Sequence, residues 1–335
     1  PFLKHISNNY DVVELMSEIL GELNVSHSGA GMRSNGRSGD VTAYLGLLFD
    51  VNYDGDGLLI DEVLDKGPFD KNHSKVEAGN IIEKIDGIEI TKDMDYYPLL
   101  NKKVGKQVLV SIYNPDTKKR WEEIVKPISK GTQNELLYQR WIKHNEEVVD
   151  SLSNGTLGYV HIRSMGDASY RDVYADILGK YNRRKGIVID TRFNGGGRLH
   201  EDIEILFSGE KYLEQVIRDS VACVMPSRRY VKPSIMIMCE ANYSNAHGTP
   251  WVYKHKKMGK LVGMPVPGTM SSVTWETLQD TDLYFGLPVV GYRTQEGYYL
   301  ENSQLEPDII VRNTPEKLAA GIDEQLEAAV KELMK

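Results

Sequence analysis

Cysteine is scarce in this chain of 335 residues, which contains only Cys223 and Cys239. Two thiols supply neither a disulfide framework nor, by themselves, the four ligands of a structural zinc site. No cluster of histidine, cysteine and carboxylate residues suggests a catalytic metal elsewhere in the sequence. We therefore expect no metal and no other cofactor.

A surplus of positive charge and long apolar runs are also lacking. Lysine and arginine number 40 against 48 aspartates and glutamates, and the formal net charge is -8. This balance gives no electrostatic reason to expect a nucleic-acid partner. The longest apolar runs, such as "PSIMIM" and "LGLLFDV", are far shorter than the roughly 20 residues needed to span a bilayer. We expect no insertion into a membrane.

The first residues, "PFLKHISNNY", lack an initiator methionine and the basic and apolar regions of a secretory signal. We interpret the sequence as a piece of a longer protein. Its charged fraction of 26% and hydrophobic fraction of 41% are ordinary for a soluble globular protein. The length is sufficient for two or three domains.

Three kinds of pattern follow one another along the chain. The stretch "DVVELMSEILGEL", residues 11–23, has apolar residues at helical spacing and predicts an amphipathic helix. Residues 41–128 contain short strand patterns separated by turns, with a short helical stretch at 92–103. From residue 134 onward, strand patterns such as "KGIVID" alternate with helix patterns such as "DASYRDVYADILGKY". This alternation predicts an α/β layer with a largely parallel sheet.

The stretch "DVNYDGDGLLID", residues 50–61, has acidic and amide residues near the spacing of a calcium-binding EF-hand loop. An EF-hand loop lies between two helices, whereas this stretch lies between two strand patterns. A β-hairpin turn is the better interpretation.

A glycine-rich stretch, "DTRFNGGG", follows a strand pattern that ends at Asp190. Gly195, Gly196 and Gly197 precede a helix pattern, and glycines there let backbone N–H groups approach a ligand closely. Such a loop suits a phosphate, the oxyanion of an acyl-transfer intermediate, or a plain tight turn. The dinucleotide fingerprint and the phosphate-loop signature are both absent.

A second stretch, "CEANYSNAHG", breaks a buried-strand pattern with polar residues. Ser244 lies there at a strand-to-helix junction, where it could be an exposed nucleophile or the N-cap of the next helix. His247 follows three residues later and is the nearest candidate base. On a helix that starts at Ser244, however, we expect its ring to point away from the serine hydroxyl.

Four motifs together resemble the C-terminal core of the tricorn protease family, a branch of the tail-specific serine peptidases. In order they are "DTRFNGGG", "CEANYSNAHG", "LVGMPVPGTM" and "YLENSQLEPDIIV". The segment "ILGELNVSHSG" resembles the family's N-terminal helical piece, and residues from "AYLGLLFDV" to "VKPISKG" resemble its inserted PDZ-like module. The resemblance covers essentially the whole chain.

The resemblance implies an α/β fold with a ClpP/crotonase-like core at residues 131–335. A helical segment that carries a Ser-His pair would occupy residues 1–40, and a PDZ-like β-rich domain residues 41–130. It further implies a homo-oligomer and a pair of N-terminal β-propellers outside the given sequence. The implied location is cytoplasmic, or periplasmic or secreted if the full-length chain carries a signal peptide.

The same resemblance assigns catalytic roles. Ser244 would be the nucleophile, and the backbone N–H of Asn245 would bind the oxyanion together with that of Gly196 or Gly197. Family members commonly have aspartate where this chain has Asn245, a change that keeps the backbone donor and puts any role of the aspartate side chain in doubt. A chemically weak hydroxyl nucleophile needs a base beside it.

The base implied by the family is His27, far away in the sequence from Ser244. Ser26 would link its imidazole to the carboxylate of Glu301, completing a Ser-His-Ser-Glu tetrad. Glu306 lies near the same strand end and is the alternative carboxylate. We therefore expect a serine peptidase that cleaves peptides or unfolded polypeptides through an acyl-enzyme, either internally or near a chain end.

The PDZ-like module would bind an extended peptide by strand addition and capture its terminal carboxylate on backbone N–H groups. Its candidate loop is "YLGLLF", which comprises Tyr44, Leu45, Gly46, Leu47, Leu48 and Phe49. Two other functions stay open. One is a catalytically silent scaffold that binds peptides through this module, and the other is a crotonase-like acyl-CoA enzyme, which also uses a glycine-loop oxyanion hole.

Overall fold

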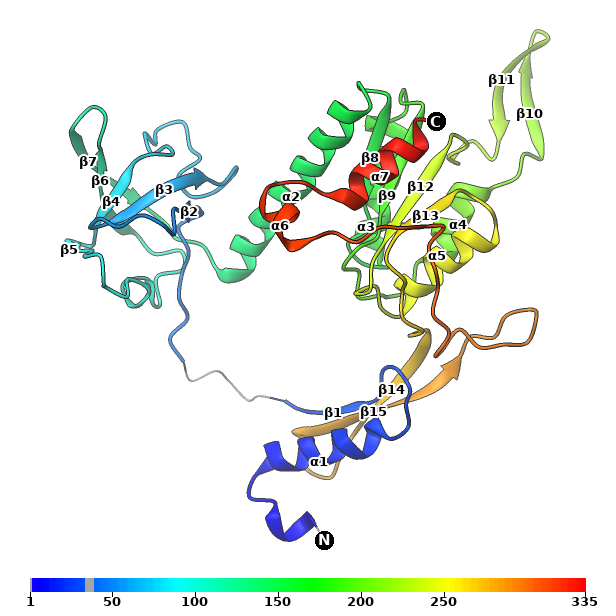
Figure 1. The fold of residues 1–335 in the computed structure, drawn as a ribbon, viewed down its shortest axis with the longest axis horizontal. Helices are drawn as coiled ribbons and strands as arrows, with labels where there is room; N and C mark the ends of the chain where they lie inside the picture. Colours follow the sequence, from blue (N-terminus) through cyan, green and yellow to red (C-terminus); the bar gives the residue numbers. More distant parts are fainter. Residues whose placement is uncertain (1, 34–38) are drawn as a thin grey trace. The chain divides into compact units, whose positions relative to one another are not determined.

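The computed structural model describes residues 2–33 and 39–335, except for the side chain of Leu3. These residues form a mixed α/β protein with several sheets (Figure 1). The chain divides into two compact units. Unit 1 contains Pro1–Asn35 and Asn145–Lys335, and unit 2 contains Gly36–His144.

Unit 2 is built on one antiparallel sheet. Its strand order is β2-β3-β4-β6-β7, with β5 paired to β4. The bounds are β2 Leu47–Phe49, β3 Leu58–Val63, β4 Ile81–Ile85, β5 Ile88–Glu89, β6 Val108–Asn114 and β7 Lys119–Val125. Alternate residues of β6, Val108, Val110 and Ile112, are fully buried, because successive side chains of a strand point to opposite faces. The predicted β-rich region is confirmed.

Two local predictions in unit 2 had different outcomes. β2 and β3 pair antiparallel on either side of residues 50–57, so the predicted hairpin is confirmed. The helical stretch predicted at 92–103 is much shorter, because only the 3-10 turn η2 (Tyr97–Leu100) forms. Pro98 lies in its first turn, and because proline has no backbone N–H to donate, a helix that began at residue 92 would lose a hydrogen bond there.

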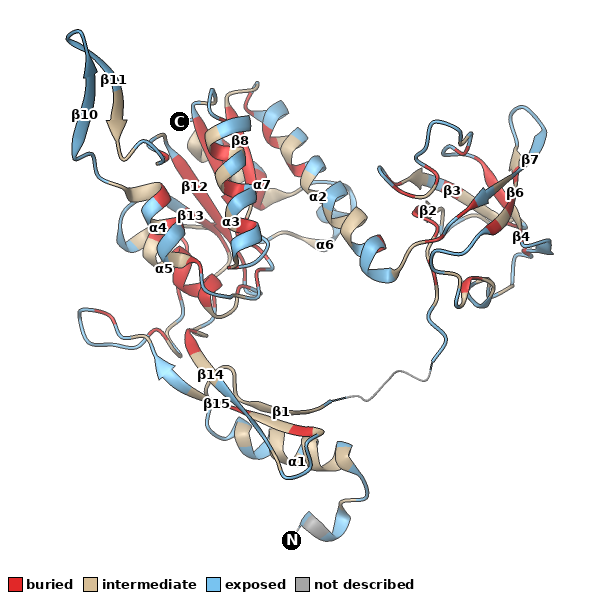
Figure 2. Ribbon diagram, turned by 180° about the vertical axis from the view of Figure 1, so that it is seen from behind, coloured by how far each residue is buried: buried red, intermediate tan, exposed pale blue. Residues whose placement is uncertain are grey.

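The core of unit 1 is a parallel five-stranded sheet of order β16-β13-β12-β9-β8. Its strands are β8 Leu157–His161, β9 Gly186–Asp190, β12 Ser234–Met238, β13 Lys260–Gly263 and β16 Ile309–Ile310. Every residue of β9 and β12 is buried, as expected when both faces of a parallel sheet are covered (Figure 2). The predicted parallel sheet is confirmed.

Helices surround this sheet. α7 packs against β9, β12 and β13, whereas α5 packs against α4 and β13. None of the described helices is long and apolar enough to cross a membrane. The bounds are α2 Lys130–Leu152, α3 Asp167–Ala175, the π-helical turn η3 Asp176–Lys180, α4 His200–Ser208, α5 Asn245–His255, α6 Pro315–Ala319 and α7 Glu324–Leu333.

A three-stranded antiparallel sheet joins the two ends of unit 1's sequence. Its order is β1-β15-β14, with bounds Gly29–Met32, Leu283–Gly291 and Ser271–Thr277. The predicted N-terminal helix, α1 (Asn9–Gly21), follows the short turn η1 (Phe2–His5) and packs on β1 and β15 (Figure 1). Asn8 caps α1 by accepting hydrogen bonds from two backbone N–H groups of its first turn. The segment just before β1 is thereby held against the start of β14.

A second small sheet is the hairpin of β10 (Leu213–Ile217) and β11 (Ser220–Met225), which is largely exposed (Figure 2). An isolated two-stranded hairpin is marginally stable in water. The sequence patterns predicted neither this hairpin nor the β14–β15 pair.

A buried ion pair fixes the end of β9. Arg192 donates hydrogen bonds to Asp190 and also pairs with Asp323 at the start of α7. Burial alone would raise the pKa of Asp190, but the adjacent Arg192 guanidinium holds that pKa below its usual range. Because the two residues flank Thr191, the pair anchors the glycine-rich loop that follows.

Candidate active site

Ser244 lies between β12 and α5 in a backbone conformation that few serines adopt. Its φ is 57° and its ψ is -126°, in a region that is strained for any residue with a side chain. It occupies the N-cap position of α5, but its hydroxyl makes no capping hydrogen bond. Its own N–H donates to Thr269 Oγ1 at 3.2 Å. The geometry favours a presented hydroxyl over a simple helix cap.

The glycine-rich loop lies directly against Ser244. A Cβ added to Gly196, whose φ is +101°, would lie 2.6 Å from Ser244 Cβ, so any side chain there would collide with the serine. Gly197, at φ +138°, would bring a Cβ to 2.1 Å from Met165 O. Glycine is therefore required at both positions for this loop to approach the serine.

The backbone N–H groups near Ser244 differ in their availability. Gly196 N donates to Asn194 Oδ1 at 2.8 Å, so its hydrogen is already engaged. The N–H groups of Gly197 and Asn245 donate to no acceptor within residues 2–33 and 39–335. Of the two glycines considered from the sequence, Gly197 is thus the one with a free donor.

The Asn245 side chain ties the start of α5 to the start of α4. Its Oδ1 accepts hydrogen bonds from the N–H groups of Leu199 at 2.9 Å and His200 at 3.1 Å. Its Nδ2 lies 2.7 Å from His200 Nδ1. Because Asn245 Oδ1 already accepts two hydrogen bonds, the contact with His200 uses the amide NH₂ as donor. His200 Nδ1 is then the acceptor and carries no hydrogen.

Ser26 and His27, which precede β1, meet Glu301 from the other end of the chain. Ser26 Oγ lies 2.8 Å from His27 Nδ1 and donates to Glu301 Oε2 at 2.9 Å. The backbone N–H of Ser26 donates to the second carboxylate oxygen, Oε1, at 2.5 Å. The Glu306 carboxylate instead accepts from the side-chain amide of Gln304. Of the two carboxylates considered from the sequence, Glu301 is the one that contacts Ser26.

The turn that carries Glu301 is itself held beside the N-terminal segment. Asn302 has a left-handed φ of 57°, and its side-chain amide donates to Asn24 O at 2.8 Å. Its backbone N–H donates to Gly268 O at 2.8 Å. These contacts fix the carboxylate opposite Ser26.

His27 is bound to Tyr243, the residue that precedes Ser244. The backbone N–H of His27 donates to the Tyr243 hydroxyl at 2.7 Å, and the two rings lie 4.6 Å apart. No hydrogen bond joins His27 to Ser244 within the described part of the chain. Burial lowers the pKa of His27 from its usual value, and the charge of Glu301 offsets part of this effect.

The contacts of Ser26 indicate which ring nitrogen of His27 carries the hydrogen. Glu301 is an acceptor when ionised, so the single proton of the Ser26 hydroxyl is donated to it. The Ser26 oxygen then accepts from His27 Nδ1–H. Nε2 is left with a free lone pair, as a general base requires.

Sequence reasoning missed Ser271, at the start of β14. Its hydroxyl lies 2.9 Å from Ser26 Oγ and 3.1 Å from His27 Nδ1. It also missed Tyr243 and the buried Asn194 and Asn242. Ser271 comes directly after "LVGMPVPGTM", so its closeness to a recognised motif was the one available signal.

His247 is not placed to act as a general base for Ser244. It is 0% exposed, and neither of its ring nitrogens has a hydrogen-bond partner. Desolvation by burial lowers its pKa to about 4. Its only hydrogen bond to Ser244 runs from its backbone N–H to the Ser244 carbonyl. A histidine whose ring makes no hydrogen bond to the serine hydroxyl and has no orienting partner lacks the geometry of a general base.

The predicted peptide-binding loop lies in unit 2. Tyr44 exchanges two backbone hydrogen bonds with Ile128, each at 2.8 Å, while Leu47, Leu48 and Phe49 form β2, at the edge of the sheet. The N–H groups of Leu45 and Gly46 donate to no backbone or side-chain acceptor in the described ranges. The loop therefore has free donors next to an open strand edge.

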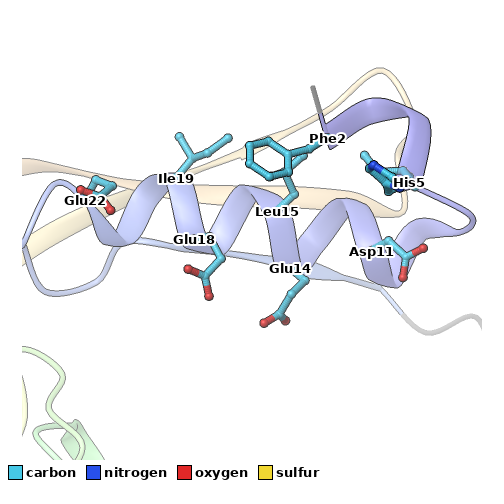
Figure 3. A pocket seen from close by; sticks show the side chains of 9 residues that line it. Phe2, His5, Asp11, Glu14, Leu15, Glu18, Ile19 and Glu22 are labelled. Atoms are coloured by element: carbon cyan, nitrogen blue, oxygen red, sulfur yellow. The ribbon is translucent and has the colours of Figure 1, made fainter.

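One pocket of about 530 Å³ lies beside α1, and it contains none of the residues above. Figure 3 shows Phe2 of η1 close to Leu15, and His5 closer to Asp11 at the start of α1. Glu14, Glu18 and Ile19 also line the pocket. In the described residues, no group of three or more His, Cys, Asp or Glu side chains could hold a metal ion.

Comparison with known proteins adds independent information. Residues 156–311 match the family model of peptidase family S41. Tricorn protease from Thermoplasma volcanium is 26% identical, and the match covers 96% of this chain and 32% of that protein. A tricorn protease homolog from Saccharolobus solfataricus is 23% identical over 99% of this chain and 31% of its own length. The chain thus spans about a third of the length of these relatives.

The fold is similar to one that has been solved. The crystal structure of the tricorn protease has a TM-score of 0.82 and 21% identity, covering 98% of this chain and 32% of that chain. At this level of identity the likeness concerns the fold.

The burial of His247 predicts an acid-sensitive stability. Its folded-state pKa of about 4 lies below the unfolded value near 6.5, so between these values the unfolded chain binds the additional proton. Stability should therefore fall as the pH drops through this window, by a total of about 3 kcal/mol. His247→Phe should lose less stability than the native chain when urea unfolding is compared at pH 7 and pH 4. The control is His255→Phe, which replaces an exposed histidine of the same helix. Equal losses of stability in all three proteins would contradict the lowered pKa of His247.

Proposed function

Because residues 156–311 match the model of peptidase family S41, we propose that this chain is a serine peptidase that hydrolyses peptide bonds through an acyl-enzyme on Ser244. The observation that carries the proposal is the series of contacts from Glu301 through Ser26 to His27, which is itself bound to the neighbour of Ser244. A carboxylate, a hydroxyl and an imidazole in this order provide an oriented base for a hydroxyl nucleophile. The four residues form the proposed Ser-His-Ser-Glu tetrad.

In the first step, Ser244 Oγ attacks the carbonyl carbon of the scissile bond and transfers its proton to His27 Nε2. The oxyanion that forms accepts hydrogen bonds from the N–H groups of Asn245 and Gly197, which are free to donate. One such donor typically contributes about 3 kcal/mol to stabilising the transition state. The N–H of Gly196 could serve only after leaving Asn194 Oδ1.

In the second step, His27 passes the proton to the leaving amine, the C–N bond breaks, and an ester remains on Ser244. A water molecule then attacks the ester while His27 Nε2 accepts its proton. His27 returns that proton to the serine as the ester bond breaks, and the carboxylic acid product releases its remaining proton to solvent and leaves as a carboxylate. Throughout, the imidazolium is supported by Ser26 rather than by direct contact with Glu301.

We extend the proposal to the architecture. Unit 2 would act as a PDZ-like module inserted between a helical segment, residues 1–40, and a ClpP/crotonase-like core, residues 131–335. The free N–H groups of Leu45 and Gly46 would capture a terminal carboxylate, and the edge strand β2 would pair with the peptide. The substrates would then be peptides or unfolded polypeptides with accessible ends.

Substitution of the nucleophile and base should abolish turnover without additive effects. Ser244→Ala and His27→Ala are each expected to lower kcat by at least about a thousandfold, and the double variant by little more, because the two residues act as a unit. His247→Phe should keep most of its activity. Turnover of a fluorogenic peptide measures all four variants.

A fluorophosphonate should label native Ser244, and a folded native chain that remains unlabelled would favour a silent scaffold or an acyl-CoA enzyme.

The acid limb of activity should lie below the ordinary histidine pKa of about 6.5. The base works as a neutral imidazole, and burial lowers the pKa of His27, so activity should persist to lower pH than for an exposed histidine. The pH dependence of kcat/KM in the native chain measures this limb. His27→Gln should lose both the limb and the rate. A variant that kept both would identify another residue as the base.

Terminal carboxylates should strengthen peptide binding. Two charge-assisted hydrogen bonds from Leu45 and Gly46 should make a free-acid peptide bind at least about tenfold more tightly than its C-terminal amide. Fluorescence anisotropy on the full chain carrying Ser244→Ala measures both affinities without cleavage. A photo-crosslinker near the peptide's C-terminus should map to residues 44–49. Equal affinities, or crosslinks confined to unit 1, would argue against a carboxylate loop here.

A further inference from the structure

Ser271 brings a second hydroxyl to the same nitrogen of His27. Its Oγ lies 3.1 Å from His27 Nδ1 and 2.9 Å from Ser26 Oγ, and it donates to the backbone carbonyl of Ser26 at 3.3 Å. The residue is only 4% exposed, so water has little access to it. The side chains of Ser26, His27 and Ser271 therefore contact one another where water has little access, so they must satisfy their hydrogen bonds among themselves and with Glu301.

Counting the protons limits the direction of these contacts. The Ser26 hydroxyl donates its proton to Glu301 Oε2, and the Ser271 hydroxyl can donate its proton to Ser26 Oγ at 2.9 Å or to Ser26 O at 3.3 Å. Both oxygens then present lone pairs to the one hydrogen on His27 Nδ1. Nδ1–H has two acceptors, of which the Ser26 oxygen is the nearer.

We propose that Ser271 is a positioning residue that acts as the second acceptor for His27 Nδ1–H and stabilises the imidazolium formed during catalysis. The inference rests on the proposed function, because it gives Ser271 a part in the same relay. Glu301 hydrogen-bonds to Ser26 and not to the imidazole, so the hydrogen-bond acceptors at Nδ1 are neutral hydroxyls, and the carboxylate acts on the charged ring only through space. The Ser271 hydroxyl, as the second of two acceptors, therefore contributes a large share of the hydrogen bonding to Nδ1–H.

The placement of Ser271 follows from the three-stranded sheet. Ser271 begins β14, whereas Ser26 and His27 directly precede β1, and both strands pair with β15. Ser272, the next residue on β14, instead contacts the Tyr292 hydroxyl at 2.9 Å. Adjacent residues of a strand point to opposite faces, so Ser272 is a matched control on the same strand.

The decisive experiment measures the imidazole directly. The native chain, Ser271→Ala and Ser272→Ala are labelled with ¹⁵N-histidine, and the His27 resonances, assigned with His27→Gln, are followed by NMR against pH. Loss of an acceptor for the charged ring should lower the pKa of His27 in Ser271→Ala by roughly half a unit to one unit. The fraction of the ring with its hydrogen on Nε2 should rise. Ser272→Ala should match the native chain. Glu301 and Tyr243, the other ionisable groups against His27, are unchanged in all three.

Activity provides the second readout. In Ser271→Ala, kcat should fall roughly 3- to 30-fold with little change in KM, and the acid limb should move to lower pH. A purely structural defect would lower kcat without moving the limb. If Ser271→Ala does not fold, Ser271→Cys keeps the side-chain shape with a weaker acceptor and should shift the pKa of His27 in the same direction.

The two proposals can fail separately. An unchanged His27 pKa and tautomer in a folded Ser271 variant would overturn the role of Ser271, even if the native chain is an active peptidase. A lowered pKa in a chain without peptidase activity would support the contact while refuting the proposed function. A pKa shift of the same size in Ser272→Ala would also overturn the inference, because it would reflect a general disturbance of β14.

Discussion

The side-chain amides of three buried asparagines, Asn194, Asn242 and Asn245, fix the loops that follow β9 and β12, and the proposed catalytic groups depend on these loops. Asn194 donates to Ile162 O and accepts from Gly196 N, so it shapes the glycine-rich loop. Asn242 accepts from Cys239 N and donates to Thr191 Oγ1, which joins the ends of β12 and β9. Asn245 links α5 to α4. Buried polar groups are costly unless they are paired, so each amide specifies one loop conformation and disfavours the alternatives.

Several residues in or beside the proposed catalytic groups have a strained backbone. His27, Phe193, Ser244 and Asn302 all have φ values between 57° and 65°, a left-handed conformation that is unusual for residues other than glycine. Each lies in or beside the proposed catalytic groups. Such conformations persist only when the surroundings determine them, and the hydrogen bonds to Tyr243, Thr269 and Asn24 provide this constraint. The network therefore fixes both the position and the conformation of the side chains proposed to react.

Local periodicity made part of this molecule predictable. Continuous apolar runs such as "SIMIM" revealed the strands of the parallel sheet, and the motifs that follow them named Ser244 and the glycine-rich loop. Periodicity carries no information about which distant segments pair, so the β1-β15-β14 sheet escaped prediction. Ser271 was missed for the same reason, since its relation to Ser26 arises only when strands over two hundred residues apart share a sheet. Glu301 was named by likeness to a family, and its choice over Glu306 needed the contacts.

In the proposed relay, the Glu301 carboxylate does not contact the imidazole directly, and this affects the pKa of His27. A carboxylate in direct contact with imidazole would favour the charged ring and raise its pKa. Here Glu301 acts through the Ser26 hydroxyl, and burial, which lowers the pKa of His27, is the larger effect. The lowered pKa favours the neutral ring, which can accept a proton, and the indirect carboxylate gives weaker support to the ring once it is charged. Hydroxyls at Nδ1 compensate for that weakness without adding charge, because they fix the hydrogen on Nδ1 in the resting state and bind it more strongly when the ring is protonated.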